Sequence, residues 1–202
     1  MDAQKIILAS GNAGKLREFQ QIFQDRAVQL IPQSEFAVSE VEETGLSFVE
    51  NALIKARHAS EISQLAAIAD DSGIEVDALK GEPGIYSARY AGVTGSGADQ
   101  ANNDKLIAAL KDIPEAQRTA RFQCVIVYMR HSRDPVPLIF QGSWEGRILL
   151  QECGVNGFGY DPLFYVPSHD CASAQLDAQV KNQISHRGIA LRKFIQCWNS
   201  LP

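Results

Sequence analysis

The sequence predicts an α/β protein with a mixed β-sheet flanked by helices, in a single domain spanning residues 1–202. Three observations predict this class. A buried strand near the start of the chain leads through a glycine loop into an amphipathic helix, and a capped helix then leads into a second apolar strand. Later segments alternate in the manner of hairpin strands. Crossovers and hairpins in one chain favour a mixed sheet.

The first predicted strand is Lys5–Ala9, because its continuous apolar run is typical of a strand buried on both faces. Leu16, Phe19 and Phe23 then recur at helical spacing. The loop at residues 10–15 therefore precedes a helix, where backbone N–H groups favour anions.

A second helix is predicted over 47–63, since Ser47 and Glu50 form a capping box. Lys55 lies on the polar face of this helix. The apolar run Leu65–Ala69 is the next expected buried strand, with Asp70-Asp71 in a turn at its tip.

The later part of the chain continues the alternation of strands and helices. The remaining predicted elements are a strand at 74–78, a helix at 98–111, strands at 120–129, 138–142 and 147–152, a weaker helical segment at 172–183 and a final helix from about 186 to 198. A long loop at 81–92 and a glycine-rich aromatic loop at 154–167 interrupt this series.

Composition limits the class of protein. With 202 residues, 45% hydrophobic and 21% charged, the chain is in the ordinary globular range, and its net charge of −5 argues against a nucleic-acid binder. Its apolar runs are shorter than the ~20 residues of a membrane span. The four cysteines are too widely spaced for a CxxC metal site and are expected to be reduced thiols in a soluble cytoplasmic protein.

Asp70 and Asp71 are the most informative residues, because paired carboxylates supply the hard oxygen ligands that Mg²⁺ prefers. An Asx turn exposed to solvent is the alternative. Glu42 and Glu43 precede the second helix, so one of them could complete the metal shell, and Lys55 could face the same phosphates. The alternative there is a solvated pair of charges.

The loop Ser10-Gly11-Asn12-Ala13-Gly14-Lys15 is not a P-loop. It lacks the full length of that motif and the hydroxyl residue that must follow the lysine. It fits a shorter phosphate-binding nest, or an ordinary glycine turn before a helix. Phe158-Gly159-Tyr160-Asp161 offers aromatic rings for stacking on a base, unless these rings serve core packing. Lys181, His186 and Arg187 bring further donors near the start of the final helix.

Taken together, these segments resemble the inosine triphosphate pyrophosphatase family, also called XTP/dITP diphosphatases. The matching segments run in order from residue 8 to 188: 8–15, Glu42-Glu43-Thr44-Gly45, Glu50-Asn51-Ala52, Lys55-Ala56, Ala69-Asp70-Asp71-Ser72-Gly73, 84–90, 157–162 and Ser185-His186-Arg187-Gly188. Two departures are Ser10, where many relatives have threonine, and Asp170-Cys171-Ala172, which replaces a more usual Gly-Lys-Thr.

The resemblance implies an elongated mixed sheet flanked by helices, with two lobes and the active-site cleft between them. It also implies a homodimer that depends on Mg²⁺ and hydrolyses ITP, dITP and XTP to the monophosphate and pyrophosphate. Such an enzyme would remove non-standard purine nucleotides from the precursor pool. An enzyme acting on ordinary nucleotides, either a broader pyrophosphatase or a phosphatase, is the alternative, and a nucleotide sensor without turnover is a third reading.

The resemblance also assigns roles to residues of this chain. Asp71 would be the general base and a metal ligand, together with Glu43 or Glu42. Phosphates and nucleotide would be bound by Ser10, Gly11, Asn12, Ala13, Gly14, Lys15, Lys55, Ser72, Phe158, Gly159, Tyr160, Asp161, Lys181, His186 and Arg187. We expect Lys15, Asp71 and Arg187 to open onto one groove.

Overall fold

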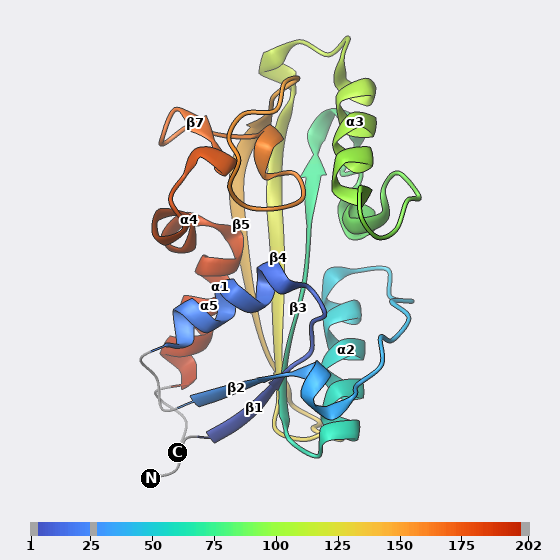
Figure 1. Ribbon diagram of the computed structural model, residues 1–202, viewed down its shortest axis with the longest axis vertical. Helices are drawn as coiled ribbons and strands as arrows, with labels where there is room; N and C mark the ends of the chain where they lie inside the picture. Colours follow the sequence, from blue (N-terminus) through green and yellow to red (C-terminus); the bar gives the residue numbers. More distant parts are fainter. Residues whose placement is uncertain (1–3, 25–27, 199–202) are drawn as a thin grey trace. The chain divides into compact units, whose positions relative to one another are not determined.

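The computed structural model describes residues 4–24 and 28–198 (Figure 1). The α-helices are α1 (Ala13–Phe23), α2 (Phe48–Ser63), α3 (Ala98–Leu110), α4 (Ala178–Ile184) and α5 (His186–Trp198). The strands are β1 (Gln4–Leu8), β2 (Val28–Pro32), β3 (Ala66–Val76), β4 (Thr119–Met129), β5 (Leu138–Ile148), β6 (Phe164–Val166) and β7 (Cys171–Ala172). Short 3-10 helices occupy several of the connections.

These strands form one seven-stranded sheet in the order β2-β1-β3-β4-β5-β6-β7. β1 pairs in parallel with both β2 and β3. In contrast, β6 pairs antiparallel with β5 and with β7. The predicted α/β class with a mixed sheet is therefore confirmed.

By their internal contacts the residues divide into two compact units. The described part of unit 1 is 4–24, 28–71, 124–142 and 187–198, and unit 2 is 72–123 and 143–186. Each unit is built from segments that are distant in sequence. The single domain over 1–202 stays a prediction.

Unit 1 has helices on both faces of its strands. Even-numbered strand residues such as Ile6 and Ile68 pack in one core with side chains of α1 and α5. Odd-numbered residues such as Ala67 and Val127 pack in another core with alanines of α2. Because successive side chains of a strand point to opposite faces, a continuous apolar run fills both cores.

Unit 2 has a core on one face of its strands, and charged pairs lie at alternate positions. Ile74 belongs to that core together with Leu106 of α3. On β4, Arg121 pairs with Asp77 at 2.8 Å and with Glu145 at 3.0 Å. This alternation of apolar and charged residues is the usual pattern of a strand with one solvated face.

The structure corrects the predicted end of a strand at Asp70 and Asp71. The segments predicted as separate strands at 65–69 and 74–78 belong to the single strand β3. Both carboxylates lie in its middle and not in a turn at its tip. Aspartate and glycine are depleted in strands, so the sequence favoured a turn between two strands. In the structure, cations from neighbouring elements form ion pairs with both buried carboxylates, and the strand continues through them.

Three further predictions of secondary structure were wrong or incomplete. The strands predicted at 138–142 and 147–152 form the single strand β5, in which a Cβ at Gly146 would lie 2.5 Å from the Phe164 ring. Glycine at position 146 lets the Phe164 ring approach the backbone of β5 closely, and it does not mark a turn. The helix predicted over 172–183 begins only at Ala178, and the strands β2, β6 and β7 were not predicted at all.

The other long elements confirm the prediction. The helices expected at 47–63 and 98–111 and the final helix correspond to α2, α3 and α5, and the side chain of Ser47 caps α2. All four cysteines are free thiols, as predicted. Across residues 4–24 and 28–198, no helix is both long and apolar enough to cross a membrane.

Candidate active site

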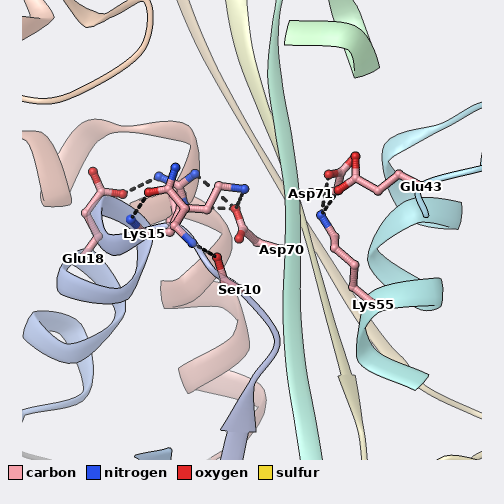
Figure 2. A network of polar contacts seen from close by, with 9 residues as sticks. Ser10, Lys15, Glu18, Glu43, Lys55, Asp70 and Asp71 are labelled. Atoms are coloured by element: carbon pink, nitrogen blue, oxygen red, sulfur yellow. Dashed lines mark hydrogen bonds and ion pairs between the residues drawn. The ribbon is translucent and has the colours of Figure 1, made fainter. Parts of the chain in front are cut away.

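Asp70 and Asp71 point to opposite faces of β3, as Figure 2 shows. Asp70 continues the even-numbered series that packs against α1 and α5, and Asp71 continues the odd-numbered series that packs against α2. Only 1% of Asp70 and 6% of Asp71 is exposed. Two buried, adjacent carboxylates therefore have separate sets of partners.

Asp70 is held by cations from two helices. Its Oδ2 lies 3.1 Å from the Lys15 ammonium and accepts hydrogen bonds from Nε and Nη2 of Arg187, each at 3.1 Å. Arg187 also donates from Nη1 to Glu18 of α1. Burial alone would raise the pKa of Asp70, but the charges of Lys15 and Arg187 outweigh it and hold this pKa well below its usual range.

The loop before α1 brings Lys15 to this cluster. Asn12 caps the helix by accepting a hydrogen bond from the Lys15 N–H at 3.0 Å, and its own N–H donates to Ser10 Oγ at 3.3 Å. The first N–H groups of a helix have no partner within the helix, so this end favours an anion. Gly11, Asn12 and Ala13 are exposed at this end, which agrees with the predicted phosphate-binding loop.

Asp71 shares its only described ion-pair partner with a second carboxylate. The Lys55 ammonium lies 2.6 Å from Asp71 Oδ1 and 2.9 Å from Glu43 Oε1 (Figure 2). Burial raises the pKa of Asp71 above its usual value, although Lys55 acts against that shift. Burial would lower the pKa of Lys55, but Asp71, Asp70 and Glu43 together raise it.

Side-chain caps fix the loop that carries Glu43. The Gly45 N–H donates to Asn51 Oδ1 at 2.8 Å, and the Leu46 N–H donates to Glu50 Oε2 at 2.9 Å. A Cβ at Gly45 would lie only 2.7 Å from Asn51 Oδ1, so the turn requires glycine. The fully buried Asn51 thus anchors the backbone two residues after Glu43.

The donor set fits a magnesium ion bound through two carboxylates. Lys55 already places one positive charge between Glu43 and Asp71, so both oxygens point at a cation. Within 4–24 and 28–198, no three His, Cys, Asp or Glu side chains form a group that could hold a metal. Mg²⁺ needs no such group, because water and substrate phosphate complete its shell. Glu42 is exposed, so the geometry favours Glu43.

In unit 2, Asp161 organises the aromatic loop predicted to bind the base. Its Oδ2 accepts hydrogen bonds from the Phe158 N–H at 2.9 Å and from Lys181 Nζ at 2.6 Å, and its Oδ1 accepts from Ser173 Oγ at 2.8 Å. Only 2% of Asp161 is exposed. A Cβ at Gly157 would lie 2.1 Å from Asp161 Oδ2, so glycine is required beside this carboxylate.

The two aromatic residues of this loop have different environments. Tyr160 is buried, and its hydroxyl donates to the Ser87 carbonyl at 2.8 Å, so it packs in the core as the alternative reading held. Phe158 is only partly buried, and the Lys181 ammonium lies 5.0 Å from its ring centroid. Phe158 is thus the more exposed of the two rings, and it lies next to a cation.

His186 and Ser72 lie near these groups in sequence but have other surroundings. The His186 ring is buried and stacks on Phe122 with a centroid distance of 4.7 Å and an interplanar angle of 12°. Ser72 follows Asp71 directly on β3 and is half-buried. Their predicted contacts with nucleotide stay predictions.

Comparison with known proteins places this arrangement in a family. A model of the Ham1 family matches residues 6–197. The chain belongs to the Ham1 family. The resemblance inferred from the sequence is confirmed by relatives that carry the name dITP/XTP pyrophosphatase.

Two such Ham1 relatives are similar over nearly their whole length. The dITP/XTP pyrophosphatase of Vibrio vulnificus (strain YJ016) is 57% identical, with 98% of this chain and 98% of that protein covered. The dITP/XTP pyrophosphatase of Shewanella oneidensis is 60% identical, with 95% and 92% covered. The likeness therefore includes every segment that carries a candidate residue.

Solved Ham1 structures share the fold. The HAM1 protein from Coxiella burnetii superposes with a TM-score of 0.90 at 48% identity, covering 98% of this chain and 100% of that one. A nucleoside-triphosphatase / dITP/XTP pyrophosphatase from Mycobacterium abscessus gives 0.74 at 40% identity, covering 95% and 98%. The α/β fold is thus the fold of Ham1 proteins.

The arrangement differs from the single groove expected for Lys15, Asp71 and Arg187. Lys15 and Arg187 contact Asp70, whereas Asp71 contacts Lys55 on the other face of β3. Adjacent residues of an extended strand cannot share a face, and the predicted turn concealed this consequence. Lys15 nevertheless acts on Asp71, because its charge opposes the rise in pKa that burial causes at that carboxyl.

Sequence reasoning missed Glu18 and Ser173. Glu18 lies three residues after Lys15 on α1, so both side chains leave the same face of the helix and reach one cluster. That spacing was a usable signal. Ser173 lies twelve positions after Asp161 and beyond the short strands β6 and β7, and no periodicity predicts that contact.

Proposed function

We propose that this chain hydrolyses ITP, dITP and XTP to the nucleoside monophosphate and pyrophosphate, and so removes non-standard purine nucleotides. The observation that carries this proposal is the pair of carboxylates, Glu43 and Asp71, that converge on Lys55. The names of the relatives support the substrate class.

Glu43 and Asp71 would hold Mg²⁺, which when bound polarises phosphate oxygens and neutralises their charge. Both carboxylates accept a hydrogen bond from the Lys55 ammonium, so their oxygens already point at one cationic position. Lys55 would then be available to phosphate oxygens as a third positive group.

Asp71 is the proposed general base. It takes a proton from the water that attacks the α-phosphorus, and the bond to the oxygen bridging the α- and β-phosphorus atoms breaks, so that pyrophosphate leaves. Burial raises the pKa of Asp71, and a base works best when its pKa approaches the working pH. The helix end at Ser10–Lys15 and the ammonium groups of Lys15 and Lys55 would bind the phosphates.

Phe158 and Lys181 are the proposed base-recognition pair. Stacking on an aromatic ring contributes about 1 to 3 kcal/mol per base and tolerates any purine. Selection would come from donors that suit the six-keto oxygen of hypoxanthine and xanthine and are left unpaired by the amino group of adenine. The Lys181 ammonium beside the Phe158 ring supplies such a donor. Lys181 also donates to Asp161, and Arg187 donates to Asp70 and Glu18, so existing hydrogen bonds do not separate these two candidates.

The test is incubation with ITP and Mg²⁺ followed by chromatographic separation of the products. IMP and pyrophosphate are expected in equal amounts. Stepwise release of orthophosphate would instead indicate a phosphatase. Comparison of kcat/KM for ITP, XTP, GTP and ATP addresses the broader alternative, which the M. abscessus relative brings forward because it is also named a nucleoside-triphosphatase. Equal values for all four would contradict selective removal.

Two further properties belong to this proposal. By its resemblance to the family, we expect a cytoplasmic homodimer whose ligand is a small nucleotide and not a nucleic acid. A net charge of −5 is consistent with the absence of a nucleic-acid partner. Light scattering after size-exclusion chromatography would measure the mass, and a monomer would contradict the expected dimer.

A further inference from the structure

Helix α3 carries two adjacent asparagines, Asn102 and Asn103, that are 2% and 3% exposed. Asparagine is an unfavourable residue inside a helix, because its side chain competes for backbone groups. Both side chains bind loops outside the helix. Asn102 accepts from the Ala91 N–H at 2.7 Å and donates to the Ala88 carbonyl at 3.2 Å. The two residues therefore have the same physical role toward different loops.

Asn103 holds the loop of Phe158. Its Nδ2 donates to the Gly159 carbonyl at 3.3 Å and to Glu152 Oε1 at 2.9 Å. Asp99, one helical turn earlier, accepts a hydrogen bond from the Gly159 N–H at 2.9 Å. Residues four apart share a helix face, so one face of α3 binds both the N–H and the carbonyl of a single glycine.

Gly159 is a conformationally demanding point of that loop. Its φ of +61° is in the left-handed region, where a side chain is strained, although a Cβ would meet nothing within 4 Å. The two bonds from α3 therefore hold Gly159 in one of the several backbone conformations that are open to a glycine. Phe158 immediately precedes it, and its own N–H is bound by Asp161.

We propose that Asn103, with Asp99, is a positioning residue for base recognition. It fixes the Gly159 turn so that the Phe158 ring is presented beside Lys181. This inference rests on the proposed function, in which Phe158 stacks on the purine. Neither Asn103 nor Asp99 needs to touch the nucleotide, since their contacts reach the backbone next to Phe158.

The experiment compares Asn103→Ala with the matched control Asn102→Ala. Both variants delete a buried asparagine from the same helix, so both are expected to lower Tm. Asn103→Ala should raise KM for ITP about fivefold or more, the loss that corresponds to about 1 kcal/mol of base stacking, with a smaller change in kcat. Asn102→Ala should leave KM unchanged.

Product inhibition separates positioning from general damage. Asn103→Ala should weaken inhibition by IMP, which carries a base, and leave inhibition by pyrophosphate unchanged. If Asn103→Ala does not fold, Asp99→Ala replaces it, because Asp99 is exposed. Asp99→Asn keeps an acceptor oxygen for the Gly159 N–H and should restore KM and IMP inhibition.

The outcomes are distinct. Wild-type protein that releases no pyrophosphate from ITP overturns the proposed function and this inference together. Active wild type, with Asn103→Ala or Asp99→Ala indistinguishable from Asn102→Ala in KM and in IMP inhibition, overturns the inference alone. Equal weakening of IMP and pyrophosphate inhibition also overturns it, because the defect would not be specific to the base.

Discussion

Two chemically identical residues, Asp70 and Asp71, lie on opposite faces of β3, and their pKa values shift in opposite directions. Asp70 meets the cations Lys15 and Arg187, and its pKa is held well below the usual range although burial acts against this. Asp71, the next residue, shares Lys55 with Glu43, and burial raises its pKa. The difference comes from the partners that each face supplies and not from the aspartates themselves.

The proposed function makes Asp71 the reactive carboxylate of the two. On the α1/α5 face, Asp70 lies against the ammonium of Lys15 and the guanidinium of Arg187. On the α2 face, Asp71 and Glu43 both lie against the Lys55 ammonium, and burial raises the pKa of Asp71. Because Mg²⁺ prefers hard oxygen ligands such as converging carboxylates, we propose that the chemistry lies on the α2 face.

The largest expected effect that tests this contrast is on folding. Asp70→Asn should lower the free energy of unfolding by about 3 to 5 kcal/mol, because it leaves buried cations without their carboxylate. Asp71→Asn should lower it less, because Lys55 keeps Glu43 as a partner and burial already disfavours the charge of Asp71. Urea unfolding followed by circular dichroism measures both. Equal destabilisation would remove the distinction between the two faces.

The next effect is on catalysis. Asp71→Asn should lower kcat for ITP a hundredfold or more, about 2.7 kcal/mol, through loss of the general base. Pyrophosphate release at saturating ITP and Mg²⁺ is the measurement, and the unfolding curve of the same preparation is the control. Near-native turnover in a folded Asp71→Asn protein would exclude Asp71 as the base.

A smaller effect is expected from pH. Because the folded pKa of Asp70 is depressed, its stabilisation is present above the unfolded pKa of about 3.9 and is lost as pH falls through the folded value. The loss should be about 2 kcal/mol, the usual size for a salt-bridged aspartate. Thermal unfolding between neutral pH and pH 2 should therefore show a steeper acid loss in wild type than in Asp70→Asn. Parallel curves would mean that Asp70 does not contribute.

The raised pKa of Asp71 has the opposite sign. Its contribution to stability is fully present below the unfolded pKa and decreases as pH rises through the folded value. Asp71→Asn should therefore reduce any loss of stability on the alkaline side of that transition. The same titrations, extended upward from pH 4, provide the measurement.

The smallest expected effect concerns the metal. Glu43→Gln should raise the Mg²⁺ concentration needed for half-maximal activity about tenfold, or about 1.4 kcal/mol, because one of two carboxylate ligands is lost. Glu42→Gln is the matched control and should change it less than about twofold, as expected for an exposed charge. Electron paramagnetic resonance can measure Mn²⁺ binding without nucleotide. Glu43→Gln should weaken that binding more than Glu42→Gln does. A larger effect at Glu42 would reverse the assignment.

Elements with strong local signals were predictable. The capping box at Ser47 and Glu50 identified α2, and the apolar run before Ser10 identified β1. β3 was divided wrongly, because two aspartates and Gly73 interrupt its apolar pattern and local propensity favours a turn there. The cations that make a continuous strand possible come from α1, α2 and α5, and no local window contains them.

The sequence named the candidate residues but did not predict how they are arranged. Local chemistry identified the acidic pair, the phosphate loop, Lys55 and the aromatic loop, because each needs only short-range residue types. Which partner each carboxylate has depends on contacts over long sequence separations, such as Asp70 with Arg187. Likewise, the sequence did not predict that Asp161 binds the Phe158 N–H, Ser173 and Lys181, and its contact with nucleotide stays a prediction.

Residue order alone determined where helices start, which runs are buried and which side chains can carry charge, because capping, periodicity and ionisation are local properties. The folded chain decided that β3 continues through its aspartates and that neighbouring carboxylates meet different cations. The physical reason is that a strand alternates its side chains between two faces, and the helices packed on each face then set the charge, the burial and the pKa of each residue.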